Sequence, residues 1–348
     1  PPFAGSWMGP VRAADTRHGI AVLALHALAH PPVDEIAAGW ERPAEHAGWD
    51  GVAAIRHTEG GDPTATNNRE LLLRTLAGYV VHPNIAAAMI VSTRGGAVGL
   101  EDLKRFLAAH DYPVDSLPVE YKELADDPES IAACRKRIAE WIPRIRRPRT
   151  PVDVRHLKIA LQCGGSDAFS GISGNPLAST AVRHLIARGG SSNLAETDEL
   201  ITAEPYILEK VRDAATAERF LDYMERFKAR LRAHGTSGEQ NPAVGNLYRG
   251  LYNIVLKSLG AAVKKHPDVR LDAVIDYSER LGAPGFTFMN SPGNDLESVA
   301  GQVATGCNLI YFITGNGSIT NFPFVPTIKI VTTTARYRLL EAEMDVNA

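Results

Sequence analysis

The sequence has few cysteines and no long apolar run. Its 348 residues include three cysteines, Cys134, Cys163 and Cys307, which are too few and too scattered for a disulfide framework. No apolar stretch approaches the roughly 20 residues that a membrane-spanning helix needs. The first residues also lack the basic start and apolar centre of a secretory signal peptide. These absences predict a cytoplasmic protein.

An excess of charge of either sign is also missing. Lys and Arg total 37 against 40 for Asp and Glu, so the formal net charge is −3. Nothing in this balance favours nucleic acid or an anionic membrane as a partner, and we expect neither. The content of 45% apolar and 22% charged residues is that of an ordinary globular protein, and 348 residues are long for one hydrophobic core. We therefore expect two domains.

Short apolar segments alternate with longer segments of helical periodicity. This alternation predicts an α/β fold with mostly parallel strands, in two Rossmann-like domains of three layers each. The expected strands are residues 19–25, 51–57, 84–92, 157–163, 191–197, 271–277, 285–290, 308–315 and 327–333. The proline-rich and basic stretch "PRIRRPRTPVDVRH" interrupts the pattern. We therefore predict domains at 1–145 and 157–348, a linker at 146–156, and a helical insertion in the second domain.

Four expected strands end in polar and glycine-rich sequence. These ends are residues 57–62, 163–167, 196–199 and 315–318. Ligands of open α/β sheets bind beyond the carboxyl ends of the strands. The four loops are therefore the candidate functional segments.

The loop at 163–167 reads Cys-Gly-Gly-Ser-Asp. Gly164 and Gly165 can let the backbone approach a ligand and present N–H groups, while Ser166 and Asp167 supply a hydroxyl and a carboxylate. The same sequence also suits a tight turn with a helix cap. Its glycine spacing matches neither a Walker loop nor a dinucleotide fingerprint. Cys163 can be a metal ligand, a nucleophile or a small buried apolar residue.

Two further segments carry candidate side chains. His57 ends an expected strand beside Glu59 and Asp62, which suits a general base or an oxygen-rich metal site, and equally an ordinary structural histidine. Asn241 and Asn246 lie in "EQNPAVGNLYRG", where their amides can bind hydroxyl groups of a polar substrate or cap the next helix.

Several strings taken together resemble the altronate/galactarate dehydratase family. They are "LQCGGSDAFSGISGNP", "ETDELITAE", "NPAVGN", "KSLGA", "ESVAGQVATGCNLIYFITGNGSITNFPFVPTIKI" and "MDVNA", and they cover the second domain nearly end to end. The first domain resembles the same family through "HTEGG" and "RELLLRTLAGYVVHPNIAAAMIV". The resemblance implies a hydro-lyase that removes water from C2–C3 of a sugar acid or related 2-hydroxy acid, giving a 2-keto-3-deoxy acid. It also implies a divalent metal, usually Fe²⁺, that stabilises the enediolate.

The resemblance and the loop chemistry together give a set of expected roles. The catalytic candidates are His57, Asp167 and Ser166. The substrate-binding candidates are Gly164, Gly165, Ser170, Glu196, Asn241, Asn246 and Asn316. The metal-ligand candidates are Cys163, His57 and Glu59.

The first domain departs from the family pattern at two positions. The family form H-T-E-G-C-G reads His57-Thr58-Glu59-Gly60-Gly61-Asp62 here, and Gly96 stands in a segment where the family has a cysteine and a glutamate. Without these thiols, histidine and carboxylates favour Mn²⁺ or Mg²⁺ over iron, or the site holds no metal. Two alternatives stay open: a lyase with changed chemistry, and a non-catalytic ligand-binding subunit. We also expect a homo-oligomer, and a separate small subunit to supply the β-rich domain of about 100 residues that precedes this region in full-length relatives.

Overall fold

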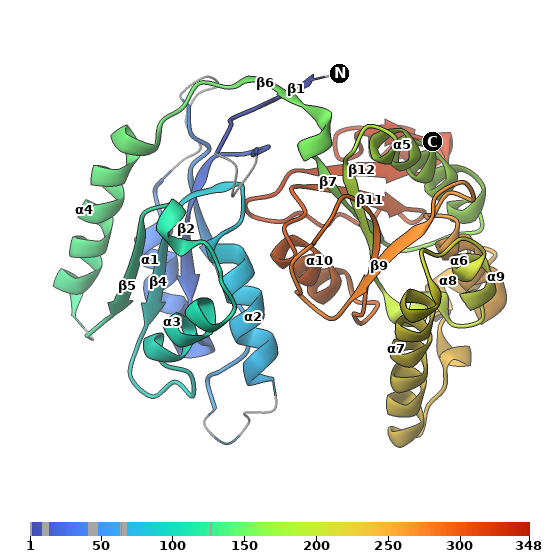
Figure 1. The fold of residues 1–348 in the computed structure, drawn as a ribbon, viewed down its shortest axis with the longest axis horizontal. Helices are drawn as coiled ribbons and strands as arrows, with labels where there is room; N and C mark the ends of the chain where they lie inside the picture. Colours follow the sequence, from blue (N-terminus) through green and yellow to red (C-terminus); the bar gives the residue numbers. More distant parts are fainter. Residues whose placement is uncertain (1, 9–13, 41–47, 63, 65–67, 126) are drawn as a thin grey trace. The chain divides into compact units, whose positions relative to one another are not determined.

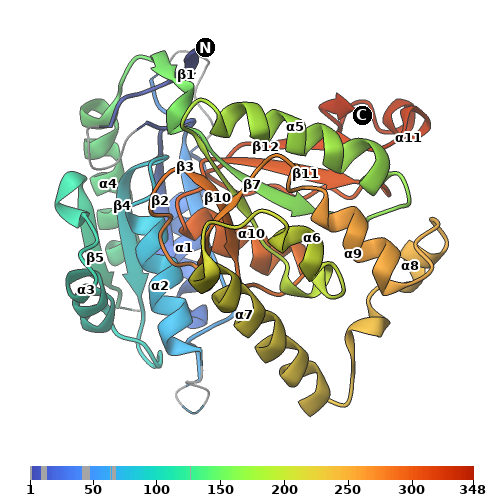
Figure 2. The ribbon, with the colours of Figure 1, turned by 45° about the vertical axis from the view of Figure 1, so that its right-hand side comes forward.

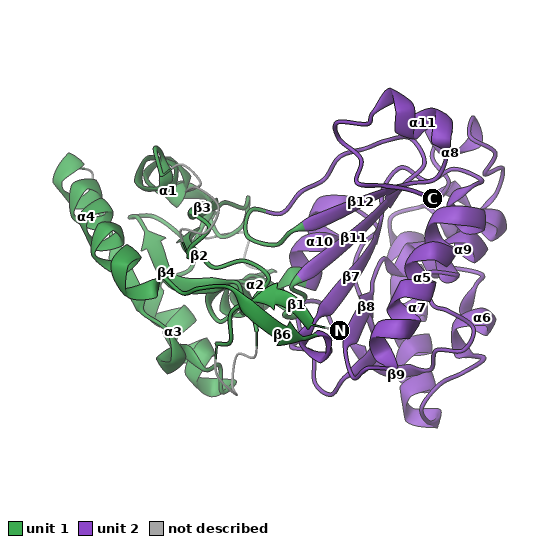
Figure 3. Cartoon of the chain, turned by 90° about the horizontal axis from the view of Figure 1, so that it is seen from above, with its two compact units in different colours: residues 1–153, 303–308, 323–326 green, residues 154–302, 309–322, 327–348 purple. Residues whose placement is uncertain are grey.

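The computed structural model describes residues 2–8, 14–40, 48–62, 64, 68–125 and 127–348. They form two compact units, each with its own parallel sheet (Figures 1 and 3). Unit 1 comprises 1–153, 303–308 and 323–326, and unit 2 comprises 154–302, 309–322 and 327–348. The predicted α/β class with mostly parallel strands is confirmed.

Unit 1 is built on a four-stranded parallel sheet with the order β3-β2-β4-β5. Its strands are β2 (Gly19–Ala24), β3 (Val52–Ile55), β4 (Ile85–Ser92) and β5 (Val119–Glu123). Every residue of β2 and β4 is buried, and helices cover both faces of the sheet (Figure 1). For this reason the two strands read as continuous apolar runs. The helices are α1 (His30–Ala37), α2 (Arg69–Val80), α3 (Leu100–Ala109) and α4 (Pro128–Ile145).

A two-stranded antiparallel ribbon joins the beginning and the end of the main part of unit 1. Strand β1 (Pro2–Gly5) pairs with β6 (Thr150–Asp153), which lies within the segment predicted as a linker. The chain then passes from unit 1 to unit 2 between Asp153 and Val154. Polar and proline-rich sequence gave no strand signal for this ribbon.

Unit 2 contains a seven-stranded parallel sheet with the order β13-β12-β11-β7-β8-β10-β9. The strands are β7 (Lys158–Cys163), β8 (Ser191–Leu194), β9 (Leu271–Ile275), β10 (Gly285–Met289), β11 (Leu309–Thr314), β12 (Thr327–Val331) and β13 (Val346–Asn347). Strands β11, β7 and β8 are neighbours in the sheet. Because all three run in the same direction, the polar loops that follow them meet at one edge.

Helices complete unit 2 (Figure 2). They are α5 (Asn175–Ile186), α6 (Glu204–Leu208), α7 (Ala214–Ala233), α8 (Val244–Leu247), α9 (Ile254–Ala262), α10 (Asp295–Ala304) and α11 (Thr334–Leu339). Helices α6 to α9 lie between β8 and β9, where the helical insertion was expected. The core contains an edge-to-face pair of rings, Phe220 and Phe288, with centroids 5.0 Å apart. In the part of the chain that the structure describes, no helix combines the length and apolarity needed to cross a membrane.

Two short segments from the last third of the chain return to unit 1. The Cys307 carbonyl lies 2.9 Å from Nε2 of His82, and Asn84 donates from Nδ2 to the Phe324 carbonyl over 2.9 Å. Cys307 is fully buried. Unit 1 therefore needs chain from both sides of β11 to complete its interior.

Candidate active site

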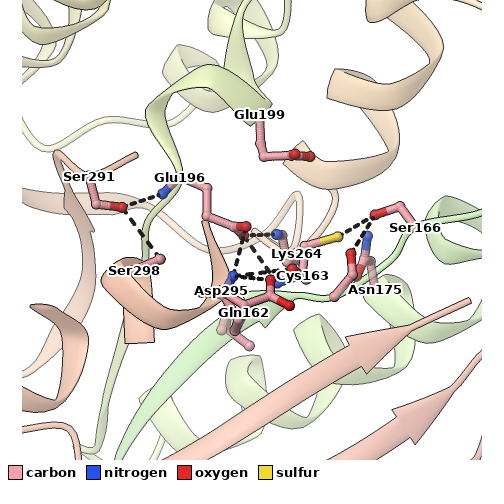
Figure 4. A network of polar contacts seen from close by, with 12 residues as sticks. Gln162, Cys163, Ser166, Asn175, Glu196, Glu199, Lys264, Ser291, Asp295 and Ser298 are labelled. Atoms are coloured by element: carbon pink, nitrogen blue, oxygen red, sulfur yellow. Dashed lines mark hydrogen bonds and ion pairs between the residues drawn. The ribbon is translucent and has the colours of Figure 1, made fainter. Parts of the chain in front are cut away.

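The carboxylate of Glu196 is the centre of a buried polar network in unit 2 (Figure 4). Its Oε1 accepts a hydrogen bond from Gln162 Nε2 at 2.8 Å. Its Oε2 accepts from Lys264 Nζ at 2.9 Å and from the Cys163 backbone N–H at 3.1 Å. The backbone of Glu196 is left-handed, with φ of 69°, a conformation that costs free energy for a residue other than glycine. A strained backbone thus holds this carboxylate just beyond β8.

Burial and the partner's charge shift the pKa values of Glu196 and Lys264 in opposite directions. Burial raises the pKa of Glu196 to about 7, against the lowering effect of the Lys264 ammonium. Burial alone would lower the pKa of Lys264, but attraction by Glu196, Cys163 and Glu199 raises it above its usual range. Lys264 therefore stays charged, and Glu196 is a carboxyl that can take and return a proton near neutral pH.

A second lysine–carboxylate pair lies beside the first. Lys257 donates from Nζ to Glu199 Oε1 and to Asn241 Oδ1, and Asn241 Nδ2 donates to Asp198 Oδ2 at 3.1 Å. Burial, with help from the Glu199 charge, raises the pKa of Asp198 to about 6. Asn241 is only half-buried, so this pair lies closer to solvent than the Glu196 pair.

Several acceptor atoms of the network are left open, among them one on Glu199 and one on Gln162. Glu199 Oε2 and Gln162 Oε1 are buried and accept no hydrogen bond from any described residue. A buried acceptor without a donor costs about 1–3 kcal/mol. Both atoms are therefore suited to take a hydrogen bond from a ligand hydroxyl or a bound water.

The local sequence explains how the network is held. After β8, the backbone of Thr197 donates to the Ser291 carbonyl at 2.9 Å and its hydroxyl accepts from the Ser291 N–H at 3.1 Å, which fixes the loop. A 3-10 turn (Thr197–Leu200) then brings Glu199 back toward the sheet edge. Lys257 lies on the buried face of α9, and Lys264 lies in the turn that follows the end of α9 at Ala262. Both lysine side chains are buried.

The predicted glycines of the 163–167 loop allow two strand-end loops to pack together. A Cβ on Gly165 would lie 2.0 Å from Asn316 Nδ2, and one on Gly164 would lie 2.6 Å from the Phe312 ring. The Gly165 N–H donates to Ser318 Oγ at 3.0 Å, and the Gly164 N–H donates to the Ile313 carbonyl at 2.7 Å. In this conformation both N–H groups bond within the protein. Their predicted contact with substrate stays a prediction.

The polar residues of the same loop also bond mainly to the protein. Asp167 Oδ1 accepts from the N–H and hydroxyl of Ser170, at 2.8 and 3.0 Å, and its Oδ2 accepts from Thr332 Oγ1 at 2.9 Å. The carbonyl of Ser166 accepts from Asn246 Nδ2 at 2.9 Å, while Asn246 Oδ1 caps the start of α8. These contacts suit the turn-and-cap interpretation. A proton-transfer role for Asp167 or Ser166 stays a prediction.

Cys163 is expected to react slowly with alkylating reagents. Burial raises the pKa of its thiol to about 12, with further contributions from Glu199 and Glu196 and against the effect of Lys264. We expect alkylation by iodoacetamide at pH 8 to be at least ~100-fold slower than for a free cysteine, because the thiolate is the reactive form. Peptide mapping by mass spectrometry measures the rate, with urea-unfolded protein as the control. Labelling at the rate of a free thiol would contradict the buried, neutral state.

In unit 1, both ring nitrogens of His57 are engaged by the backbone. Nε2 donates to the Ala24 carbonyl at 2.8 Å, and Nδ1 accepts from the Glu59 N–H at 3.3 Å. Burial lowers the pKa of His57. The ring is therefore neutral, with no nitrogen left for a substrate proton or a metal in this conformation.

The two glycines that depart from the family pattern face the segment after β2. A Cβ on Gly96 would lie 2.2 Å from the His26 ring, and a Cβ on Gly61 would lie 3.2 Å from Ala27 Cβ. His26 is fully buried, with its Nε2 3.1 Å from Ser92 Oγ. The imidazole of His26 thus fills the space that a side chain at residue 96 would need.

Comparison with known proteins identifies the family to which the chain belongs. A model described as "D-galactarate/Altronate dehydratase, C-terminal" matches residues 154–348, and "D-galactarate dehydratase/Altronate hydrolase, second domain" matches residues 10–146. The chain belongs to the altronate/galactarate dehydratase family. The predicted resemblance is confirmed.

Individual relatives of this dehydratase-family chain are similar over most of its length. It is 32% identical over 307 residues to an altronate dehydratase of Bacillus subtilis (strain 168), covering 87% of this chain and 60% of the relative. It is 31% identical over 287 residues to an altronate dehydratase of Escherichia coli (strain K12), covering 82% of this chain and 56% of the relative. It is 30% identical over 320 residues to "(2R)-sulfolactate sulfo-lyase subunit beta" of Chromohalobacter salexigens, covering 91% and 80%. The chain thus spans less than two thirds of the two altronate dehydratases.

The predicted metal ligands of this family member belong to different units of the chain. Cys163 belongs to unit 2, with its thiol against Ser166, whereas His57 and Glu59 belong to unit 1. Within the described ranges, no group of three or more His, Cys, Asp or Glu side chains is arranged to hold a metal ion. The metal stays a prediction.

Sequence reasoning identified part of this network and missed its cations. Cys163, Ser166, Glu196 and Asn241 were candidates, and the structure brings them together in unit 2. Lys257, Lys264 and Gln162 were not, and Glu199 was included only as part of the candidate loop at 196–199. One signal was available: Lys257 occupies a buried position of α9, where the helical period calls for an apolar residue.

Proposed function

We propose that this chain is the catalytic region of a hydro-lyase that removes water from a sugar acid and leaves a 2-keto-3-deoxy acid. Membership of the dehydratase family supports the reaction class, since the relatives are named altronate and galactarate dehydratases. The observation that carries the proposal is the buried network of two lysines and their carboxylates at the carboxyl ends of β7 and β8. Such a network offers both proton-transfer groups and fixed positive charge.

The elimination needs three things, two of which we assign to residues of this network. A base must take the proton at C2, an acid must protonate the departing hydroxyl at C3, and positive charge must stabilise the enediolate that forms at the substrate carboxylate. We assign the positive charge to Lys257, because Asn241 beside it is half-buried and borders solvent. We assign the base to Glu196, which Lys264 holds in place. The acid stays unassigned.

A screen of purified chain against aldonates and aldarates tests the activity. We expect at least one sugar acid to yield a 2-keto acid in assays supplied in turn with Fe²⁺, Mn²⁺ or Mg²⁺. The Glu196→Gln variant should lose at least ~100-fold in kcat, since general base catalysis contributes about 10²–10⁴-fold. Glu343→Gln, at an exposed position, is the matched control and should keep full activity. Failure of folded protein to convert any sugar acid, alone or with the expected small β-rich subunit added, would exclude the proposal, and elemental analysis of the same sample tests for the predicted metal.

A second candidate function is elimination from a shorter 2-hydroxy acid. One observation favours it: the chain spans 80% of the sulfolactate sulfo-lyase subunit, a larger share than of either altronate dehydratase. Including (2R)-sulfolactate in the screen and measuring sulfite release separates the two reactions. That relative is named as a subunit, which supports the expectation of a small β-rich partner for this chain. Activity that requires the addition of such a subunit would support the partner.

A further inference from the structure

Two carboxyl groups of unit 2 accept hydrogen bonds from the same side-chain nitrogen. Gln162 Nε2 donates to Glu196 Oε1 at 2.8 Å and to Asp295 Oδ1 at 3.3 Å (Figure 4). Glu196 lies in the loop after β8, and Asp295 is the first residue of α10, which follows β10. Because both carboxyls reach one nitrogen atom, they lie close enough to act on neighbouring atoms of one small ligand.

Further hydrogen bonds hold the segment of Asp295 against the loop of Glu196. The Glu196 N–H donates to Ser291 Oγ at 3.0 Å, and Ser291 Oγ lies 3.4 Å from Ser298 Oγ on α10. Strands β8 and β10, which precede the two segments, are parallel neighbours in the sheet. The spacing of the two carboxyls is therefore set within unit 2.

Asp295 does not cap the helix that it begins. Asn294, the residue before it, takes that role, since its Oδ1 accepts from the Leu296 N–H at 3.1 Å. The side chain of Asp295 is half-buried, and its Oδ2 accepts no hydrogen bond from any described residue. This carboxyl can therefore contact a ligand oxygen and regain a proton from water.

The other carboxyls around the network lack this combination of features. Both oxygens of Asp167 accept hydrogen bonds from its own surroundings. Glu199 is paired with a lysine ammonium, and Asp198 accepts from an asparagine that does not contact Glu196. Among the described residues, Asp295 is the carboxyl that has both an open oxygen and a shared donor with Glu196.

The surroundings of Asp295 favour its protonated form. Burial raises the pKa of this carboxyl, and the Glu199 charge adds to the rise, while the Gln162 N–H and the two buried ammonium groups of the network oppose it. The negative charges of Glu196 and Asp295 also repel each other, so an ionised Glu196 favours a protonated Asp295. Such a carboxyl holds its proton to a higher pH than an ordinary aspartate does.

We propose that Asp295 is the acid that protonates the departing C3 hydroxyl, with Glu196 as the base. The C2–H bond breaks as Glu196 takes the proton, and the C3–O bond breaks with its electron pair staying on oxygen. That oxygen takes the proton of Asp295 and leaves as water. The enol that remains gains a proton at C3 and loses one from its C2 hydroxyl, and a proton passes from Glu196 to Asp295 through solvent. The inference rests on the proposed function.

A substrate whose leaving group needs no proton isolates this role. The probe is the 3-deoxy-3-fluoro analogue of the sugar acid that is converted fastest in the screen, since fluoride departs without protonation. Asp295→Asn should lower kcat for the sugar acid at least ~100-fold, the usual contribution of an acid or base. For the fluoro analogue its kcat should stay within about 5-fold of wild type. Glu196→Gln should lose activity with both substrates, because both need the base.

Two further variants control this experiment. Glu297→Gln removes a carboxyl from an exposed position of the same helix and should keep wild-type rates with both substrates. Asp295→Glu should regain part of the activity on the sugar acid, because it restores a carboxyl at a slightly different position. Circular dichroism and Tm show that each variant is folded, and release of 2-keto acid and of fluoride measures the rates.

Two results would overturn the assignment of Asp295. One is a folded Asp295→Asn variant that converts the sugar acid at the wild-type rate. The other is an equal loss of activity on the sugar acid and on its fluoro analogue, which would indicate a structural role. A wild-type chain that converts no sugar acid would instead exclude the proposed function, and this acid with it.

Discussion

Replacement of Lys264 by methionine is expected to lower the free energy of unfolding by about 3–5 kcal/mol, the usual cost of removing one partner of a buried ion pair. Both side chains of the pair are at most 1% exposed, so water cannot replace the lost ammonium. Urea denaturation followed by circular dichroism measures the change. A loss below about 1 kcal/mol would show that the Glu196 carboxylate does not depend on this cation.

The loss of unfolding free energy in Lys264→Met should also depend on pH. Without Lys264 the pKa of Glu196 rises further, since the ammonium lowers it. When a carboxyl group has a higher pKa in the folded protein than in the unfolded chain, the protein loses folding stability as the pH rises through the folded pKa. The difference between variant and wild type should therefore be smaller at pH 5 than at pH 8.

Lys265 supplies the matched control for this variant. It is also buried, but its ammonium lies over the Tyr206 ring rather than against a carboxylate. Lys265→Met is expected to cost no more than about 1 kcal/mol, the scale of a cation–π contact. The double variant Lys264→Met/Glu196→Gln should recover part of the loss, because it removes both charges. Purely additive losses would contradict a direct coupling between the two side chains.

The second large effect is expected on catalysis. Lys257→Met should lower kcat/KM for the sugar acid identified in the screen by about 100- to 1,000-fold, the range seen when one group that stabilises an oxyanion is removed. The physical reason is the loss of the positive charge that we assign to the substrate carboxylate. Lys257→Arg should restore part of the activity, because it restores the charge at a slightly different position. Steady-state kinetics measures both variants.

Stability must be separated from activity in this test. Lys257→Met leaves Glu199 without its cation, so the double variant Lys257→Met/Glu199→Gln is included to remove the unpaired charge. We expect the double variant to be more stable than the single variant but equally inactive. Lys329→Met, which alters a lysine on β12 that contacts Asn321, should keep wild-type kinetics. Activity of Lys257→Met within about 5-fold of wild type would exclude the assigned role.

The sequence predicted the strands that are buried along their whole length and missed some of those that are partly exposed. Strands β2 and β4 are continuous apolar runs because helices cover both sides of their sheet, and this signal is independent of the rest of the chain. Strands β5 and β6 are partly exposed and rich in polar residues, so their own sequences gave no comparable signal. Their pairing depends on partners that are distant in the sequence.

The same distinction applies to the candidate site. Glu196 was predicted because it follows a strand in a polar loop, and its position is confirmed beyond β8. Lys264 was missed because a lysine near the end of a helix normally lies in solvent. Its burial depends on Glu196, which lies 68 residues earlier in the chain. A contact between residues so far apart in the chain cannot be predicted from the residues around Lys264, because it forms only when the sheet folds.

The return of two short segments to unit 1 limits how this protein can be divided. The chain leaves unit 1 after Asp153, yet Asn84 and His82 bond to carbonyls of Phe324 and Cys307. A fragment that ends at the crossing would expose those side chains and lose the chain that covers them, although it would contain a whole parallel sheet. No single cut therefore yields two self-sufficient parts. A continuous stretch of chain that contains all of unit 1 therefore also contains most of unit 2.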